Sequence, residues 1–315
     1  MTPTVVYETY WRFAAERQAI YERRLTDPVG PWTEDRILQT YKFTNAFRAA
    51  DRVSQFLIRE VQYGAGRSQA PIEVFFRTFL FNICKKIETW ELLERELGPL
   101  TSDTSFFEID RILTEAMTAG DVIFTAAYVI PTPKFDRKGK HANWIALLAK
   151  MLDDDDLPAG LQACGNLKEV YDKLHTYSGM GPFLAFQYAI DLNYSTLLNF
   201  DEDEFVVAGP GALDGISKCF TDIGKKVAPK EIIYEMVDRQ EEEFERLGLE
   251  FNGLFGRRLQ PIDCQNLFCE ISKYARVAHP LVEGVAGRTK IKQHYKVHPA
   301  PLTKPFFPPK WGLKV

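Results

Sequence analysis

Four consecutive acidic residues are the strongest candidates for chemistry in this sequence. They are Asp201, Glu202, Asp203 and Glu204, and the apolar stretch that follows, residues 205–212, favours a position at the edge of the core. A carboxylate at such an edge can stabilise a developing cation, and it can orient or deprotonate a water molecule. A run of four acids is as often a solvated cap, so the run alone leaves both interpretations open.

A pair of glycines lies about one helix before these acids. Gly179, Met180 and Gly181 follow an amphipathic segment, and Pro182 comes directly after them. Glycine permits a positive φ and a close approach of the backbone, and proline is favoured in the first turn of a helix. The amides of such a turn can bind a DNA phosphate without any side-chain charge. The pattern therefore predicts a helix–hairpin–helix element, although a plain packing joint between two helices would look the same.

A basic segment near the C-terminus favours an anionic partner. The formal net charge is −4, but the stretch from Gly284 to Val315 contains no Asp or Glu. Its basic residues are Arg288, Lys290, Lys292, Lys296, Lys304, Lys310 and Lys314. Because Arg288, Lys290 and Lys292 are crowded together, we expect them to bind the DNA backbone. A basic tail that only aids solubility is the alternative.

Helices must position these groups. Apolar residues at helical spacing predict helices along most of the chain, and strand signals are sparse, so the expected class is mostly α. Thr33 is expected to cap a helix, residues 122–129 to be extended, and the proline-rich residues 298–315 to form an extended arm. The expected helices are 6–24, 43–63, 72–86, 106–118, 143–152, 166–174, 182–192, 211–223, 229–247 and 263–277.

The expected helix at residues 43–63 carries polar residues three or four positions apart. These residues are Asn45, Arg48, Arg52 and Gln55. Amide side chains can pair with a base edge and arginine with a phosphate, so the row predicts a base pocket. Asp263 and Asn266, on the expected helix at 263–277, are predicted to contribute to it. The alternative is a solvated helix face.

Composition excludes several classes of protein. The hydrophobic content of 45% in 315 residues supports a large core, and no apolar run reaches the roughly 18 residues that span a bilayer. The five cysteines are scattered and the N-terminus lacks the pattern of a signal peptide, so we expect reduced thiols in the cytoplasm. Metal-ligand spacing and a GxxxxGK[ST] phosphate loop are missing from the sequence, and we expect no metal and no cofactor. Nothing in the sequence predicts the oligomeric state.

Several stretches resemble one narrow family. They are residues 10–24, 31–58, 201–220 and 261–277, and the resemblance covers roughly residues 8–293. These stretches resemble the α-glutamyl/putrescinyl thymine pyrophosphorylase-like proteins, which are related to the helical domain of 5-hydroxymethyluracil DNA kinases. That family is a divergent branch of the helix–hairpin–helix DNA glycosylase superfamily. The resemblance implies a two-lobed helical fold with a basic, proline-rich C-terminal arm. Its expected parts are an N-terminal helical lobe (1–135), a hairpin lobe with the carboxylate loop (136–284) and the arm (285–315).

The resemblance also implies an enzyme that acts on modified bases in double-stranded phage DNA. Our leading expectation is a monofunctional DNA N-glycosylase that flips out a hydroxymethylated or hypermodified pyrimidine and hydrolyses its N-glycosidic bond, in defence against phage. The order of the superfamily's elements places the catalytic carboxylate at Asp201, with Asp203 or Glu204 in reach. Phe183 occupies the position of the lysine of the lyase members, so strand cleavage is not expected.

Two other activities fit the same residues. The first is a transferase that attaches an amine or amino acid to a hydroxymethyl pyrimidine in DNA, and the second is a non-catalytic reader of modified DNA. A kinase interpretation is weaker, because without a phosphate loop this chain would form only the helical part of such a protein.

Overall fold

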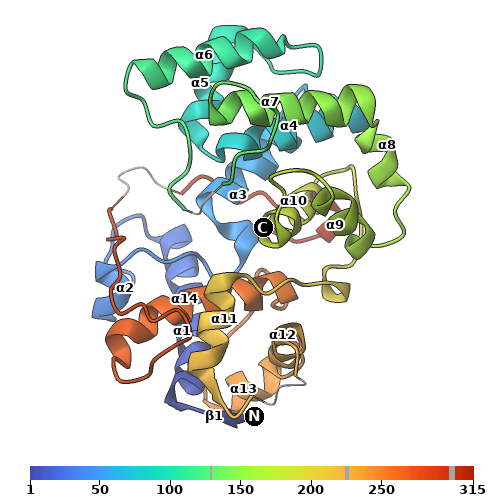
Figure 1. The fold of residues 1–315 in the computed structure, drawn as a ribbon. Coiled ribbons are helices and arrows are strands. Elements are labelled where there is room, and N and C mark those ends of the chain that lie inside the picture. Colours follow the sequence, from blue (N-terminus) through green and yellow to red (C-terminus); the bar gives the residue numbers. More distant parts are fainter. Residues whose placement is uncertain (128–129, 224–226, 298–301) are drawn as a thin grey trace. The chain divides into compact units, whose positions relative to one another are not determined.

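The computed structural model describes residues 1–127, 130–223, 227–297 and 302–315. Helices dominate these residues, which confirms the predicted mostly α class (Figure 1). The strands in the described part are two short ones, β1 (Thr2–Pro3) and β2 (Phe220–Thr221), which pair antiparallel.

The chain forms two compact units. The first combines Met1–Asp51 with Phe205–Val315, and the second is Arg52–Glu204. These bounds differ from the three ranges expected from the sequence, because the first unit is built from both ends of the chain.

The first unit is organised around three helices. Helices α1, α11 and α14 contact one another and lie side by side in Figure 1. Aromatic rings pack against α1: Tyr10 lies 4.8 Å from Phe268 of α14, and Trp11 lies 5.2 Å from Phe244 of the neighbouring helix α13, measured between ring centroids. The helices of this unit are α1 (Val5–Thr26), α2 (Arg36–Thr40), η1 (Arg48–Ala50), α11 (Pro210–Cys219), α12 (Pro229–Asp238), α13 (Gln240–Arg246), α14 (Pro261–Ala278) and η5 (Pro309–Trp311).

Helices α11 and α14 approach each other at two glycines. A β-carbon built on Gly215 would lie 2.0 Å from the carbonyl oxygen of Phe268, and one on Gly211 would lie 2.9 Å from Cys269 Sγ. The spacing of four residues puts both glycines on one face of α11. Glycine is therefore required here because the backbones of the two helices are in direct contact.

The second unit is a helical assembly around α4, which contacts α7, α8 and α10 (Figure 1). Phe79 packs edge-on against Tyr188, with ring centroids 4.9 Å apart, and Trp144 stacks near Tyr188. Its helices are α3 (Arg52–Phe56), η2 (Leu57–Gln62), α4 (Pro71–Cys84), α5 (Ile87–Leu97), α6 (Phe106–Thr118), α7 (Lys140–Ala149), η3 (Lys150–Asp154), α8 (Leu157–Gln162), α9 (Leu167–His175), α10 (Pro182–Tyr194) and η4 (Glu202–Glu204).

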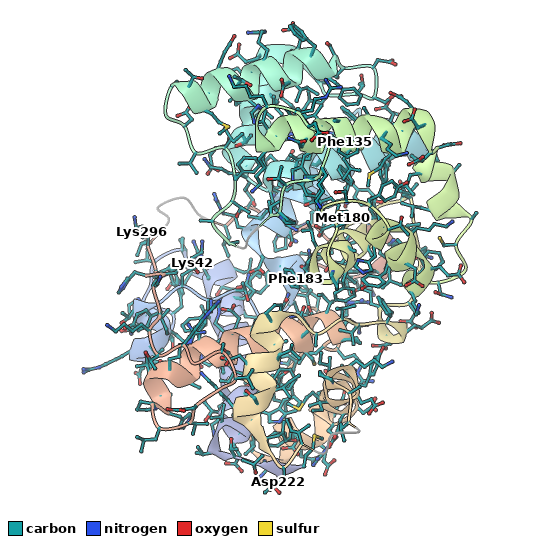
Figure 2. The ribbon with its side chains drawn as sticks, in the orientation of Figure 1. Lys42, Phe135, Met180, Phe183, Asp222 and Lys296 are labelled. Atoms are coloured by element: carbon teal, nitrogen blue, oxygen red, sulfur yellow. The ribbon has the colours of Figure 1, made fainter. Side chains whose placement is uncertain are left out.

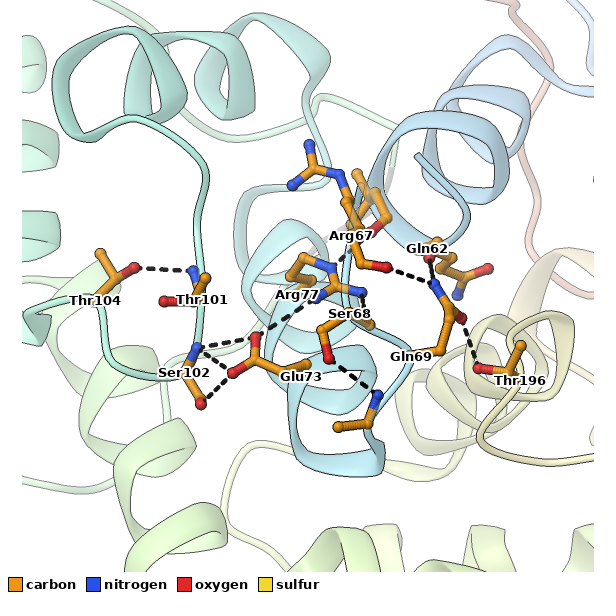
Figure 3. A network of polar contacts seen from close by, with 12 residues as sticks. Gln62, Arg67, Ser68, Gln69, Glu73, Arg77, Thr101, Ser102, Thr104 and Thr196 are labelled. Carbon is orange, nitrogen blue, oxygen red and sulfur yellow. Dashed lines mark hydrogen bonds and ion pairs between the residues drawn. The ribbon is translucent and has the colours of Figure 1, made fainter. Parts of the chain in front are cut away.

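The buried Arg77 fixes the loop that precedes α4 (Figure 3). Its guanidinium donates to the carbonyl oxygens of Val61 at 2.9 Å and Ser68 at 2.7 Å. Glu73, one turn earlier, lies 3.5 Å from Arg77 and accepts from the backbone N–H of Ser102 at 3.1 Å. A buried charge is tolerated when hydrogen bonds satisfy it, and here those bonds tie the end of η2 and the loop that follows it to α4.

The expected helix at 43–63 is wrong over its first third. Residues 42–46 are not helical, η1 is a short 3-10 turn, and α3 begins at Arg52. Hydrogen bonds within the loop explain the difference: Asn45 N donates to Asp51 Oδ1 and Asn45 Nδ2 donates to the carbonyl of Ala50, both at 2.8 Å. Local bonds of this kind compete with helix formation.

Other expectations were confirmed or need smaller corrections. The helix at 106–118 has the predicted bounds, whereas the expected helix at 229–247 is divided at Arg239 and the N-cap of α2 is Asp35 rather than Thr33. Residues 122–127 contain no strand, and residues 128–129 of that expected extended piece lie outside the described residues. Residues 302–315 of the arm contain no helix longer than the 3-10 turn η5, which agrees with the prediction that the arm is not helical, and its residues 298–301 also lie outside the described part.

Candidate functional site

The predicted hairpin is a turn between α9 and α10 in the second unit. Gly179 has φ +85°, and a β-carbon there would lie 2.9 Å from Pro133 Cγ, so both conformation and packing require glycine. Met180 is buried (Figure 2), and its carbonyl oxygen lies 2.9 Å from His175 Nδ1. Since a carbonyl can only accept, His175 Nδ1 carries the proton of this bond.

The second glycine has a different environment. Gly181 is the N-cap of α10 and is exposed, and a β-carbon added to it would have no atom within 4 Å. Pro182, the first helical residue, is exposed as well. The positive end of the α10 dipole therefore opens to solvent beside Gly181, which is the geometry that favours an anion.

The acidic run forms the 3-10 turn η4, also in the second unit. Asp201 Oδ1 accepts from the backbone N–H of Asp203 at 2.9 Å, so Asp201 caps this turn. Asp201, Asp203 and Glu204 are exposed, whereas Glu202 is buried. The three residues predicted to be catalytic thus lie on the surface of their unit. Glu202, the one acid of the run that was not predicted to be catalytic, is the buried one.

Three of the predicted pocket residues come together in the first unit. Asp263, near the start of α14, accepts from the backbone N–H of Arg48 at 2.8 Å and from that of Gln260 at 3.1 Å. The loop 44–51 that carries Asn45 and Arg48 is thereby fixed against the N-terminus of α14. This cluster depends on residues more than 200 positions apart in the sequence.

Arg17 of α1 completes this cluster. Its guanidinium donates to the carbonyl of Thr44 at 2.8 Å and to Asn45 Oδ1 at 2.7 Å. Because both ends of the Asn45 amide bond within the protein, Asn45 shapes the loop. Glu270, also on α14, accepts from Thr44 N at 3.1 Å and pairs with Lys273 at 2.6 Å. The Glu270–Lys273 pair therefore anchors the loop.

The loop 44–51 contains a carboxyl group whose pKa is near neutral pH. Burial raises the pKa of Asp51 to about 7, against the hydrogen bond from Asn45 and the charge of Arg17. Burial likewise raises the pKa of Asp263 to about 6, and it lowers the pKa of the Arg17 guanidinium. A carboxyl that titrates near pH 7 can take up or release a proton during a reaction.

Of the other three predicted pocket residues, two lie in the second unit. Arg52 and Gln55 belong to α3 in the second unit, where the exposed Arg52 lies 3.6 Å from Glu88. Asn266 is half-buried on α14. The continuous polar helix face expected from Asn45 to Gln55 is therefore wrong, because Asn45 lies in a loop.

The basic segment is exposed and attached to the first unit. Arg288, Lys290 and Lys292 are all exposed. The chain beyond them pairs with the end of α2: Lys42 N donates to the carbonyl of Gln293 at 3.0 Å, on the side of the unit where Figure 2 labels Lys42 and Lys296. The segment is thus held on its C-terminal side, and its cationic side chains are exposed.

Membrane-spanning helices and metal-binding clusters are both absent from the described residues. Among them, no helix is long and apolar enough to cross a membrane. Among the described residues there is also no group of three or more His, Cys, Asp or Glu side chains that could hold a metal ion.

Comparison with known proteins identifies the class of the chain. Residues 4–284 match the family model described as the helical domain of 5-hmdU DNA kinase, and the chain belongs to this family. One relative is the 5-hmdU DNA kinase of Bacillus phage SP10, which is 27% identical over 290 residues, or 87% of this chain and 45% of the relative. The chain thus spans less than half the length of that relative. No solved structure matches.

These comparisons correct the leading expectation from the sequence. A monofunctional N-glycosylase that excises a base by hydrolysis is wrong, because the family and the relative are named for a kinase, which is a transferase. The relation to 5-hydroxymethyluracil DNA kinases is confirmed. The link to the glycosylase superfamily and the roles of individual residues stay predictions.

Sequence reasoning missed Arg17 and Asp51 as members of a candidate site. Asp51 looks like an ordinary neighbour of Arg48, three positions away, and Arg17 looks like a polar position on an amphipathic helix. They are half-buried because distant segments of the chain pack together around the 44–51 loop. No local pattern carries that information.

Proposed function

We propose that this chain binds DNA that carries a 5-hydroxymethyl pyrimidine and presents the hydroxymethyl oxygen for group transfer, while the base stays attached to its sugar. The match of residues 4–284 to the helical domain of 5-hmdU DNA kinase carries this proposal. The name of the phage relative supports phosphate as the transferred group and hydroxymethyluracil as the base.

Asp51 is the proposed proton acceptor in this reaction. When the hydroxymethyl oxygen forms its bond to phosphorus, its O–H bond breaks and a base takes the proton, while the donor's leaving phosphate keeps the electron pair of the broken P–O bond. A carboxyl whose pKa is raised to about 7 is well matched to that task at neutral pH. Asn45 holds Asp51 by donating to Oδ1, and Arg17 holds Asn45.

The DNA backbone is assigned to two surfaces, each argued within its own unit. In the second unit, the exposed N-terminus of α10 at Gly181 suits a phosphate. In the first unit, Arg288, Lys290 and Lys292 supply exposed positive charge with no acid between Gly284 and Val315. A helix–hairpin–helix fold like that of DNA glycosylases would use the hairpin in the same way, and the positive φ of Gly179 supports that finer assignment.

Binding of the phosphoryl donor is not assigned to this chain. The sequence has no GxxxxGK[ST] loop, and the alignment covers 45% of the phage kinase. We therefore assign to these residues the recognition and presentation of the base.

A binding assay with matched duplexes tests the proposal. Duplexes that differ only in one thymine, 5-hydroxymethyluracil or 5-hydroxymethylcytosine are titrated with protein, and the hydroxymethylated duplexes should bind more tightly. Equal affinity for the thymine duplex would reject recognition of the modified base.

A second assay tests the reaction. The same duplexes are incubated with ATP, together with the segment of the phage kinase outside the alignment, and the released nucleosides are weighed by mass spectrometry. A gain of one phosphate supports kinase chemistry, and Asp51→Asn should abolish the gain while sparing binding. Attachment of an amine or amino acid, the other reaction at the same substrate, needs a phosphate or pyrophosphate on the hydroxymethyl oxygen as the leaving group, so it would show as a different mass gain when an amine is added together with ATP. Binding without any gain would leave only a reader function.

A further inference from the structure

An exposed apolar loop follows α14 in the first unit. Leu281 is 95% exposed and Val285 is 75% exposed, within the nine residues 279–287. Single exposed apolar residues are common on protein surfaces. Two on one short loop, next to a basic segment, form a feature that the proposed proton transfer does not use.

The loop is fixed at both ends. At its start, His279 N donates to the carbonyl of Ala275 at 2.9 Å, and His279 Nε2 lies 2.8 Å from Thr9 Oγ1. At its end, Ala286 N donates to Asp214 Oδ1 at 2.7 Å and Val285 N donates to Ser217 Oγ at 3.1 Å. The protruding part is thus held on α1, α11 and α14, so little ordering is required when it binds.

Asp214 keeps its negative charge although it is buried. Burial alone would raise the pKa of this carboxyl, but the hydrogen bonds from Ser272 and Ala286 and the charges of Lys218 and Arg276 outweigh it, and the net pKa is lowered. The loop packs closely on this group, since a β-carbon at Gly284 would lie 2.3 Å from Asp214 Oδ1. The anchor therefore stays charged, and charge-assisted bonds of this kind are among the stronger hydrogen bonds.

The charge around the loop indicates the partner. Arg288, Lys290 and Lys292 follow directly and are exposed, and Glu283 is the one acidic residue of the loop. A partner that offers phosphates beside an apolar surface matches this combination. Duplex DNA does so, because base steps can be opened by an apolar side chain while neighbouring phosphates bind cations.

We propose that loop 279–287 is a wedge that enters the base stack of duplex DNA with Leu281 at its tip. The wedge would occupy the space left when the modified base leaves the helix, and residues 288–292 would hold the adjacent phosphates. This inference rests on the proposed function, to which it adds the device that makes the base accessible.

A fluorescence experiment tests the wedge. A duplex with 2-aminopurine beside 5-hydroxymethyluracil is titrated with protein, because 2-aminopurine brightens when it unstacks. The wild type should raise the signal several-fold. Leu281→Ala should lose most of this rise and bind roughly tenfold more weakly, the change expected when the burial of one leucine side chain is reduced to that of alanine. Val29→Ala is the control, since Val29 is 73% exposed elsewhere in the same unit.

The outcomes separate the wedge from the proposed function. A Leu281→Ala protein that binds and brightens like the wild type would overturn the wedge and leave the proposed function standing. Tight binding by the wild type with no brightening would overturn it too, because the protein would then bind the duplex without opening its base stack. Wild-type protein that binds no duplex would overturn both. Thermal melting of each variant should match the wild type, because both substituted side chains are exposed.

Discussion

Lys85 Nζ lies 2.7 Å from Asp191 Oδ2 inside the second unit, where Asp191 is fully buried. Lys85 follows α4 in the left-handed conformation, with φ +46°, and this turn directs its side chain to α10. Gln62 Nε2 donates to the backbone carbonyl of Asp191 at 2.7 Å and so extends the contact to η2. The pair joins elements at 57–62, 71–84 and 182–194.

Loss of one member of this pair should destabilise the protein strongly. Lys85→Met or Asp191→Asn leaves the other group without its ionic partner in the core, and the expected loss is about 3–5 kcal/mol in the free energy of unfolding. The double variant Lys85→Met/Asp191→Leu should recover much of this loss, because no lone charge remains. Urea unfolding followed by circular dichroism measures all three, and single variants as stable as wild type would contradict the burial of the pair.

Gly215→Ala should disrupt the contact of α11 with α14. The added methyl group would meet the Phe268 carbonyl oxygen at 2.0 Å, so the helices must separate, and such overpacking costs roughly 1–3 kcal/mol or more. Gly160→Ala is the matched control, because Gly160 is also helical but has no atom within 4 Å. Its variant should melt at the same temperature or slightly higher, since alanine favours helices. Equal melting temperatures for both variants would be incompatible with the close contact.

Asp51 should make stability fall as pH rises. Below pH of about 4 the carboxyl is protonated in both folded and unfolded chains, and between about 4 and 7 it is ionised only in the unfolded chain. The folded state binds the extra proton in that window, so the free energy of unfolding decreases through it. Asp51→Asn removes this titration while its amide oxygen can still accept from Asn45.

Urea midpoints at pH 5 and pH 7.5 should therefore show the Asp51→Asn protein gaining stability relative to wild type at the higher pH. Asp238→Asn, on the exposed end of α12, serves as the control and should show no such gain. A constant difference between wild type and Asp51→Asn across the two pH values would rule out the raised pKa.

The two glycines of the hairpin should respond differently to alanine. Gly179→Ala forces a side chain into a positive φ and against Pro133, and it should lower the melting temperature. Gly181→Ala meets no atom and should leave melting unchanged, but it should weaken DNA binding if a phosphate approaches the α10 N-terminus. Mobility shifts at two salt concentrations measure the binding, and unchanged affinity of the Gly181→Ala protein would remove this surface from the proposed DNA contacts.

Local signals predicted the elements that depend on local interactions. Helix α6 has the predicted bounds: its apolar residues recur at helical spacing, and in the structure the side chain of Ser105 caps it by accepting from the backbone N–H of Glu108. The prediction of a helix at residues 44–51 was wrong although these residues also fit a helical period. Asn45 forms hydrogen bonds within its own loop, and Glu270, far away in the sequence, accepts a hydrogen bond from the backbone N–H of Thr44. The raised pKa of Asp51 follows from that distant packing, which no local pattern contains. Gly179 shows the opposite case, since its predicted positive φ is a local requirement.

The first unit is made of two separate segments of the chain, and this affects the order in which parts of the protein can fold during synthesis. Tyr10 and Trp11 on α1 have ring partners at Phe268 and Phe244, so a nascent chain exposes part of these aromatic side chains until α13 and α14 have left the ribosome. The continuous segment Arg52–Glu204 can fold meanwhile, ahead of the helix that precedes it. During translation the N-terminal helix is therefore a natural client for a chaperone, and a truncated product that ends before α14 should aggregate through it.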